Sequence, residues 1–157
     1  MATPFDALFA HYGGFFELPA GLLEAVARTE SNLNPAAIGD GGRSRGLFQI
    51  YDTTARQLGF TGELDELLDP EVSTAVAARY MRAILDSQGE WVPENFYSEY
   101  NSGIPDLWQR SSEVRRHVEN FMRNYRSTAV TAAAGGSLVL LAAIAAVWFW
   151  RRRRNAS

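Results

Sequence analysis

The chain has 157 residues, the length of one ordinary domain, and 46% of them are hydrophobic, which is too many for a disordered polypeptide. It contains no cysteine, which excludes disulfides and thiolate metal sites, and its two histidines do not favour a histidine-based metal centre. Residues 1–128 hold eleven arginines against eighteen carboxylates, a net charge of −7. Because nucleic-acid binding depends mainly on neutralising phosphates, this acidic region is predicted not to bind nucleic acid.

Residues 1–128 have the pattern of a helical domain. The predicted helices begin at a proline or a small polar residue, as helix N-termini commonly do. In chain order these starts are Pro19, Asp52, Asp69 with Pro70, Pro93, and Ser111 or Ser112. The first helix runs towards Glu30 with Leu22, Leu23 and Val26 on one side. The second and fourth are predicted to end at Gly59 and Gly103.

Strand signals are weak along the whole chain. Only the glycine-rich stretch at residues 39–46, with the residues that follow it, has room for short extended segments. This stretch lacks the Gly-Lys-Ser/Thr ending of a phosphate-binding loop and no hydrophobic strand precedes it, so nucleotide binding is not predicted.

A second region begins near Ser127. Residues 129–150 carry no charge, and 22 residues are enough for a helix to cross roughly 30 Å of hydrocarbon. Trp148 and Trp150 suit the membrane interface, and the arginines at positions 151–154 suit a cytoplasmic flank. We therefore expect a catalytic domain at residues 1–126, a linker and transmembrane helix at 127–150, and a basic cytoplasmic tail at 151–157. A buried core helix is the alternative for the apolar segment.

The positive-inside rule then places the domain on the periplasmic or outer side of a membrane, with the C-terminus cytoplasmic or inside a virion. The N-terminus has no basic region before its apolar residues, so it is not predicted to be a secretory signal. This combination favours a phage protein over a bacterial envelope enzyme.

Glu30 is the candidate catalytic residue. It follows an apolar helical segment and precedes a polar turn, so its carboxyl group is expected to be partly desolvated. Desolvation raises the pKa of a carboxyl group and keeps it protonated near neutral pH, as a general acid for glycosidic cleavage requires. Taken by position alone, however, Glu30 reads more simply as a solvated residue at a helix end.

Three motifs around this residue change that interpretation. In order, they are Glu30-Ser31-x-x-Asn34-Pro35, Gly46-Leu47-Phe48-Gln49-Ile50 and Tyr100-Asn101-Ser102-Gly103. Together they resemble the catalytic domain of the soluble lytic transglycosylase family, which is related in fold to goose-type lysozyme. The resemblance covers roughly residues 17–126. It implies a mainly α, compact, lysozyme-like helical domain with a cleft, and peptidoglycan as the substrate.

The resemblance also implies roles for single residues. Glu30 matches the lone catalytic acid and base, and Ser31 matches a residue that positions the substrate or the acid. Gln49 matches a residue of the glycan cleft, and Tyr100 and Asn101 match the pair that orients the catalytic carboxyl group and the sugar. Phe48 replaces the family's usual methionine and is expected to keep an apolar wall against a sugar ring. Glu99 stands where the family has alanine and is expected to point away from the site.

In the implied mechanism, Glu30 protonates the oxygen between N-acetylmuramic acid and N-acetylglucosamine, and the muramic acid's own N-acetyl group stabilises the anomeric carbon. The Glu30 carboxylate then removes the proton of the sixth-carbon hydroxyl, which closes an anhydro ring without water. Substrate-assisted mechanisms of this kind are known among glycosidases. No metal or organic cofactor is implied. The alternatives are a hydrolytic muramidase and a catalytically dead wall-binding protein of a virion or envelope.

The expected partners are therefore peptidoglycan glycan strands and, through residues 129–150, a lipid bilayer. Other virion or envelope proteins are further candidate partners. The expected role is local opening of the cell wall during phage entry, and trimming of glycan for a bacterial secretion apparatus is the alternative setting.

Overall fold

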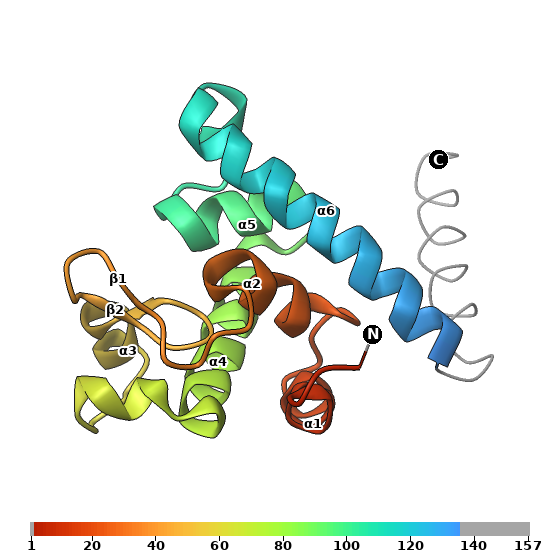
Figure 1. The fold of residues 1–157 in the computed structure, drawn as a ribbon. Helices are drawn as coiled ribbons and strands as arrows, with labels where there is room; N and C mark the ends of the chain where they lie inside the picture. The colour runs from red at the N-terminus through yellow and green to blue at the C-terminus, as the bar shows by residue number, and fades with distance from the viewer. Residues whose placement is uncertain (1, 136–157) are drawn as a thin grey trace, which may run out of the picture.

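A computed structural model describes residues 2–135, which form a mainly helical domain with one small sheet (Figure 1). The α-helices are α1 (Asp6–Phe15), α2 (Leu22–Ser31), α3 (Asp52–Gln57), α4 (Pro70–Gln88), α5 (Pro93–Ser102) and α6 (Ser112–Gly135). Two 3-10 helices, η1 (Leu64–Leu68) and η2 (Leu107–Gln109), lie between them. The strands are β1 (Ile38–Gly39), β2 (Ser44–Arg45) and β3 (Ile50–Tyr51). The mainly α class predicted from the sequence is confirmed.

Helix α2 forms the centre of the domain. Five of its first six residues are buried: Leu22, Leu23, Ala25, Val26 and Ala27. Helix α6 packs along α2 and α5, while α4 contacts α1, α2 and α5. The sheet and α3 lie on one side of α2, and α1 lies on the other (Figure 1). The C-terminal end of α2, which carries Glu30, is thereby held inside the domain.

The helix ends follow the predicted signals with two exceptions, the first being Pro19, which lies three residues before the start of α2 at Leu22. The Asp69 side chain caps α4 by accepting bonds from the backbone N–H groups of Glu71 and Val72, and α5 ends at Gly103 in the left-handed region. Asp52 differs from its predicted role as an N-cap. Tyr51 occupies that position, and Asp52 is the first residue of α3, where it pairs with Arg56 at 3.0 Å.

The sheet is antiparallel, with the strand order β1-β2-β3. Ile38 pairs with Arg45, and Ser44 pairs with both Gly39 and Tyr51. The sheet lies in the glycine-rich stretch and the residues next to it. This confirms the one region that was predicted to hold extended segments. Each strand has two residues, so the sheet acts as a local support for loops rather than as a layer of the core.

Helix α6 continues through the predicted domain boundary. Residues 127–135, expected to begin a linker, extend the helix without a break, and the buried side chain of Thr128 donates a hydrogen bond to the Gly21 carbonyl oxygen at 3.1 Å. Within residues 2–135, no helix has both the length and the apolar character needed to cross a membrane. Residues 136–150 of the predicted membrane segment and the basic tail at 151–157 lie outside the described residues.

Candidate active site

Glu30 opens into a cavity of about 750 Å³, here called the Glu30 cleft. Its walls come from α2, the sheet, α3, α4, α5 and the start of α6. The lining residues that bear on the chemistry are Glu30, Asp40, Gln49, Tyr51, Tyr97, Tyr100, Asn101 and His117. The cleft thus joins residues that lie up to 88 positions apart in the sequence, from Thr29 to His117. Among the described residues, no group of three or more histidine, aspartate or glutamate side chains is placed so that it could hold a metal ion.

The surroundings of Glu30 favour its protonated form near neutral pH. Burial raises the pKa of the Glu30 carboxyl group from 4.5 to about 7, the hydrogen bond from Tyr97 opposes this rise, and the negative charge of Asp40 adds to it. Removing a carboxyl group from water disfavours its charged form, which explains the direction of the largest effect. A carboxyl group with this pKa can both donate and recover a proton at neutral pH.

The hydroxyl group that contacts Glu30 belongs to Tyr97. It donates a hydrogen bond to Oε1 of Glu30 at 2.7 Å, and the tyrosine ring is buried. Tyr97 is not among the site residues predicted from the sequence. One signal could have found it, because Tyr97, Tyr100 and Asn101 are spaced by three and four positions on a predicted helix and therefore share one face.

Tyr100 supports the cleft in a different way from that predicted. Its hydroxyl group donates to the Phe48 carbonyl oxygen at 2.9 Å instead of to the catalytic carboxyl group. The Phe48 ring also differs from the prediction, because it is fully buried and packs edge-on against Phe9, with ring centroids 6.0 Å apart. A sugar in the cleft would not meet this ring. Phe48 contributes through its backbone carbonyl, which ties the sheet segment to α5.

Gln49 lines the cleft, but its amide group is used within the sheet region. Oε1 accepts a hydrogen bond from Ser44, and Nε2 donates to the carbonyl oxygens of Ala37 and Gly46. A Cβ atom at Gly39 would lie 2.2 Å from Oε1 of Gln49, so a side chain at that position would displace the amide. Gln49 therefore fixes the shape of one cleft wall, and its backbone adopts a left-handed conformation there, with φ of 48°.

Ser31 and Asn101 occupy different places relative to the cleft. The Ser31 hydroxyl group lies within bonding distance of the carbonyl oxygens of Leu47, at 2.9 Å, and Ala27, at 3.1 Å, and Ser31 is not among the residues that line the cavity. Its contacts join the end of α2 to the sheet segment. Asn101 lines the cleft and is exposed, which leaves its amide group accessible to a ligand.

The carboxylates of Glu99 and Asp40 lie in different places relative to the cleft. Glu99, expected to point away from the site, accepts bonds from Ser87 and Gln88 of α4 and does not line the cleft. Asp40 does line it, and one of its oxygens, Oδ2, accepts a hydrogen bond from the Tyr51 hydroxyl group and lies 3.2 Å from the Ser44 hydroxyl oxygen. Besides Glu30, the cleft is lined by the carboxylates of Glu113, at the start of α6, and Asp40, in the loop between β1 and β2.

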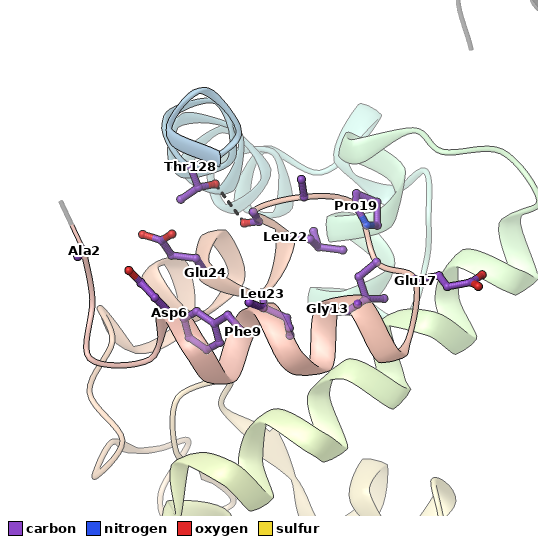
Figure 2. A pocket seen from close by; sticks show the side chains of 15 residues that line it. Ala2, Asp6, Phe9, Gly13, Glu17, Pro19, Leu22, Leu23, Glu24 and Thr128 are labelled. Carbon is purple, nitrogen blue, oxygen red and sulfur yellow. Dashed lines mark hydrogen bonds between the residues drawn. The ribbon is translucent and has the colours of Figure 1, made fainter. Parts of the chain in front are cut away.

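A second cavity of about 720 Å³ lies away from Glu30, between α1, the start of α2 and Thr128 of α6 (Figure 2). Its three carboxylates are Asp6, Glu17 and Glu24, and Glu24 pairs with Arg28 at 2.7 Å. This cavity shares no lining residue with the Glu30 cleft. The cavity therefore lies next to α6 at Thr128 and away from the Glu30 carboxyl group.

The sequence matches the family described as transglycosylase SLT domain over residues 8–121. It is 38% identical over 87 residues to membrane-bound lytic murein transglycosylase F of Shewanella loihica, an alignment with 55% of this chain and 17% of that protein. It is 32% identical over 117 residues to invasion protein IagB of Salmonella typhimurium, with 71% of this chain and 70% of that protein aligned. The chain thus covers most of IagB but a small part of the Shewanella relative.

Solved structures agree with this assignment. The 70 kDa soluble lytic transglycosylase of Escherichia coli aligns with a TM-score of 0.66 and 25% identity, over 77% of this chain and 23% of that one. An inactive mutant of the lytic transglycosylase Slt of Pseudomonas aeruginosa aligns with a TM-score of 0.68 and 19% identity, over 78% of this chain and 24% of that one. The second likeness supports the lysozyme-like fold alone.

Proposed function

The chain belongs to the transglycosylase SLT domain family, and from this premise we propose that it is a peptidoglycan lytic transglycosylase whose catalytic acid is Glu30. It cleaves the β-1,4 bond between N-acetylmuramic acid and N-acetylglucosamine and leaves anhydro-muramic ends. The observation that carries this proposal is the Glu30 carboxyl group in an open cleft, with a pKa raised to about 7 by burial.

Each group of the cleft has a part in this reaction. Glu30 in its protonated form donates to the glycosidic oxygen, and the bond from that oxygen to the anomeric carbon breaks. The N-acetyl group of the muramic acid stabilises the anomeric carbon, and the Glu30 carboxylate then accepts the proton of the sixth-carbon hydroxyl as the anhydro ring closes. Asn101 is placed to bind the sugar, while Gln49 and Tyr100 hold the cleft walls in position.

Replacing Glu30 tests the assignment. Glu30→Gln keeps the size of the side chain but cannot donate or recover the proton, and general acid–base catalysis is typically worth ~10²–10⁴-fold. We expect the variant to remain folded and to lose lytic activity on purified peptidoglycan by at least about 10²-fold. Glu99→Gln, on the same cleft-forming part of the molecule but bonded to α4, is the matched control and should retain activity. Near-normal turnover by Glu30→Gln would rule out Glu30 as the acid.

A hydrolytic muramidase is the second candidate function, and Asp40 is the observation that favours it. Glycosidases generally use two carboxyl groups, and Asp40 shares the cleft with Glu30. In that reaction Asp40 would accept a proton from a water molecule that attacks the anomeric carbon, and the product would carry a reducing sugar. Product analysis separates the two functions, because Asp40→Asn would then lower the yield of reducing ends without lowering that of anhydro ends.

We also propose that residues 129–150 anchor the enzyme in a membrane, with the catalytic domain on the periplasmic or outer side, and that it opens the wall locally during phage entry. The uncharged segment followed by four arginines supports the anchor and its orientation. Detection of the protein in purified phage particles tests the setting. Its recovery from a bacterial envelope in cells that produce no particles would instead place it with the bacterial relatives.

A further inference from the structure

We infer that Tyr97 is a positioning residue that decides which oxygen of Glu30 carries the catalytic proton. The inference rests on the proposed function of Glu30 as the general acid. Its basis is the hydrogen bond from the Tyr97 hydroxyl group to Oε1 of Glu30 at 2.7 Å. Among the hydrogen bonds of residues 2–135, no other reaches the Glu30 carboxyl group, so Oε2 is the oxygen left to exchange a proton with the substrate.

Tyr97 is held in one orientation by aromatic packing. Its ring is 1% exposed and stacks on Phe121 of α6, with centroids 4.5 Å apart and planes inclined by 3°. On the same helix it stacks against Tyr100, with centroids 6.1 Å apart and planes inclined by 14°. A ring packed in this way cannot turn its hydroxyl group away from Glu30 without disturbing the contact between α5 and α6.

Tyr97 also remains a hydrogen-bond donor at any pH at which the domain works. Burial raises the pKa of the Tyr97 phenol far above its usual range, and the nearby charge of Glu30 raises it further. The phenol therefore keeps its proton and can neither replace Glu30 as the acid nor act as the base. When Glu30 is protonated, Oε1 accepts from Tyr97 as a carbonyl oxygen and the transferable proton lies on Oε2.

The hydrogen bond gains strength as the reaction proceeds. A bond to an ionised carboxylate is roughly twice as strong as one between neutral groups. The contact therefore strengthens when Glu30 passes its proton to the glycosidic oxygen, which stabilises the carboxylate that forms. The same effect lowers the pKa of Glu30 and opposes the rise caused by burial, so that the value stays near the working pH.

Tyr97→Phe and Tyr100→Phe make a matched pair of tests. Both remove one hydroxyl group from the same face of α5, but the first removes the bond to Glu30 and the second removes the bond to the Phe48 carbonyl oxygen. The Glu30 side-chain carboxyl carbon is titrated by ¹³C NMR in the full chain, and its resonance is assigned by its absence from Glu30→Gln. Thermal unfolding of each variant confirms that it is folded.

We expect Tyr97→Phe to move the midpoint of the Glu30 titration upward by about one pH unit, as losing a hydrogen bond to a charged group implies. Tyr100→Phe should leave that midpoint in place while slowing cleavage through a loosened cleft wall. An unchanged or lower midpoint in Tyr97→Phe would overturn the inference, and so would an equal shift in both variants. The titration does not depend on activity. A protein that fails to cleave glycan would therefore contradict the proposed function, while the shift of the Glu30 midpoint would still test the role of Tyr97.

Discussion

At the scale of single residues, the carboxyl group proposed as the catalytic acid is largely shielded from water but still opens into the cleft. Glu30 is the penultimate residue of α2, whose preceding residues are buried, and it faces the cleft. A buried carboxylate without partners would be strongly unfavourable. The domain avoids this cost because Glu30 is neutral below its pKa of about 7, and the hydrogen bond from Tyr97 stabilises the charged form above it.

The same balance predicts a dependence of stability on pH. The folded-state pKa of Glu30, about 7, lies above its ordinary value of 4.5, so the folded domain binds more protons than the unfolded chain between these values. The stability associated with Glu30 is thus fully present below pH 4.5 and is lost as the pH rises through 7, by at most about 3 kcal/mol. Denaturant titrations should show that Glu30→Gln lacks this loss and is more stable than the wild type at pH 8. An equal loss in both proteins would contradict the shifted pKa.

The residues of the cleft could be predicted from the sequence only in part. The apolar helix before Glu30 indicates partial desolvation, but the three motifs around it, through their resemblance to a known family, were needed to predict it as the catalytic acid. Phe48 was placed wrongly because the backbone turns sharply at Gln49, with φ of 48°, and a sequence motif does not reveal which side chains such a turn sends into the core. Asp40 was missed because its entry into the cleft depends on the loop between β1 and β2.

At the scale of elements, the domain depends on how closely α6 approaches the start of α2. Gly21 precedes α2 with φ of 74°, and Thr128 of α6 packs on it and bonds to its carbonyl oxygen (Figure 2). A Cβ atom at Gly21 would lie 2.9 Å from Oγ1 of Thr128 and 3.1 Å from its carbonyl carbon. The second of these atoms is backbone and cannot move without shifting the helix.

Gly21→Ala should therefore destabilise the domain more than a comparable glycine substitution. Gly89, which ends α4 with φ of 68°, has no atom within 4 Å of an added Cβ, so Gly89→Ala measures backbone strain alone. We expect Gly89→Ala to cost about 1 kcal/mol and Gly21→Ala to cost a further ~1–3 kcal/mol from overpacking. Urea unfolding of both variants provides the comparison. Equal losses would show that α6 does not constrain Gly21.

The helices with strong end signals could be predicted from the sequence. Prolines and capping residues locate α2, α3, α4, α5 and α6 within a few positions. Helix α1 was not delimited, because Phe9 is its only buried residue and the sequence there lacks a broad apolar stripe. The strands have two residues each, too short for alternation to appear, and the continuation of α6 past residue 127 depends on its contact with Gly21.

At the scale of the whole molecule, an acidic domain is joined to an uncharged segment and a basic end. Deleting residues 129–157 should give a soluble, monomeric and active domain, because Thr128, the last residue retained, completes the contact between α6 and α2. The full chain should need detergent or lipid, since an exposed 22-residue apolar segment would exceed the few hundred Å² of apolar patch that monomers tolerate. Sedimentation of both forms with and without detergent measures this.

Orientation can be tested on the same full chain. Each arginine at positions 151–154 should contribute roughly 1 kcal/mol at an anionic cytoplasmic surface, so replacing all four with glutamate should scramble the topology. The same change does not touch the catalytic domain. Protease protection measures directly on which side of the membrane residues 1–128 lie. Cleavage of residues 1–128 only from the cytoplasmic side of the wild-type chain would show that the proposed orientation is reversed and that the enzyme faces away from its substrate.

The central claim is that Glu30 drives cleavage without water, and mass spectrometry of the product ends tests it most directly. Purified glycan strands are digested with residues 1–128, in the wild-type form and as Glu30→Gln, and the new muramic acid ends are examined. We expect anhydro ends, each lighter by one water than a reducing end, from the wild type and none above background from Glu30→Gln. Reducing ends alone from the wild type, or equal yields of anhydro ends from both proteins, would contradict it.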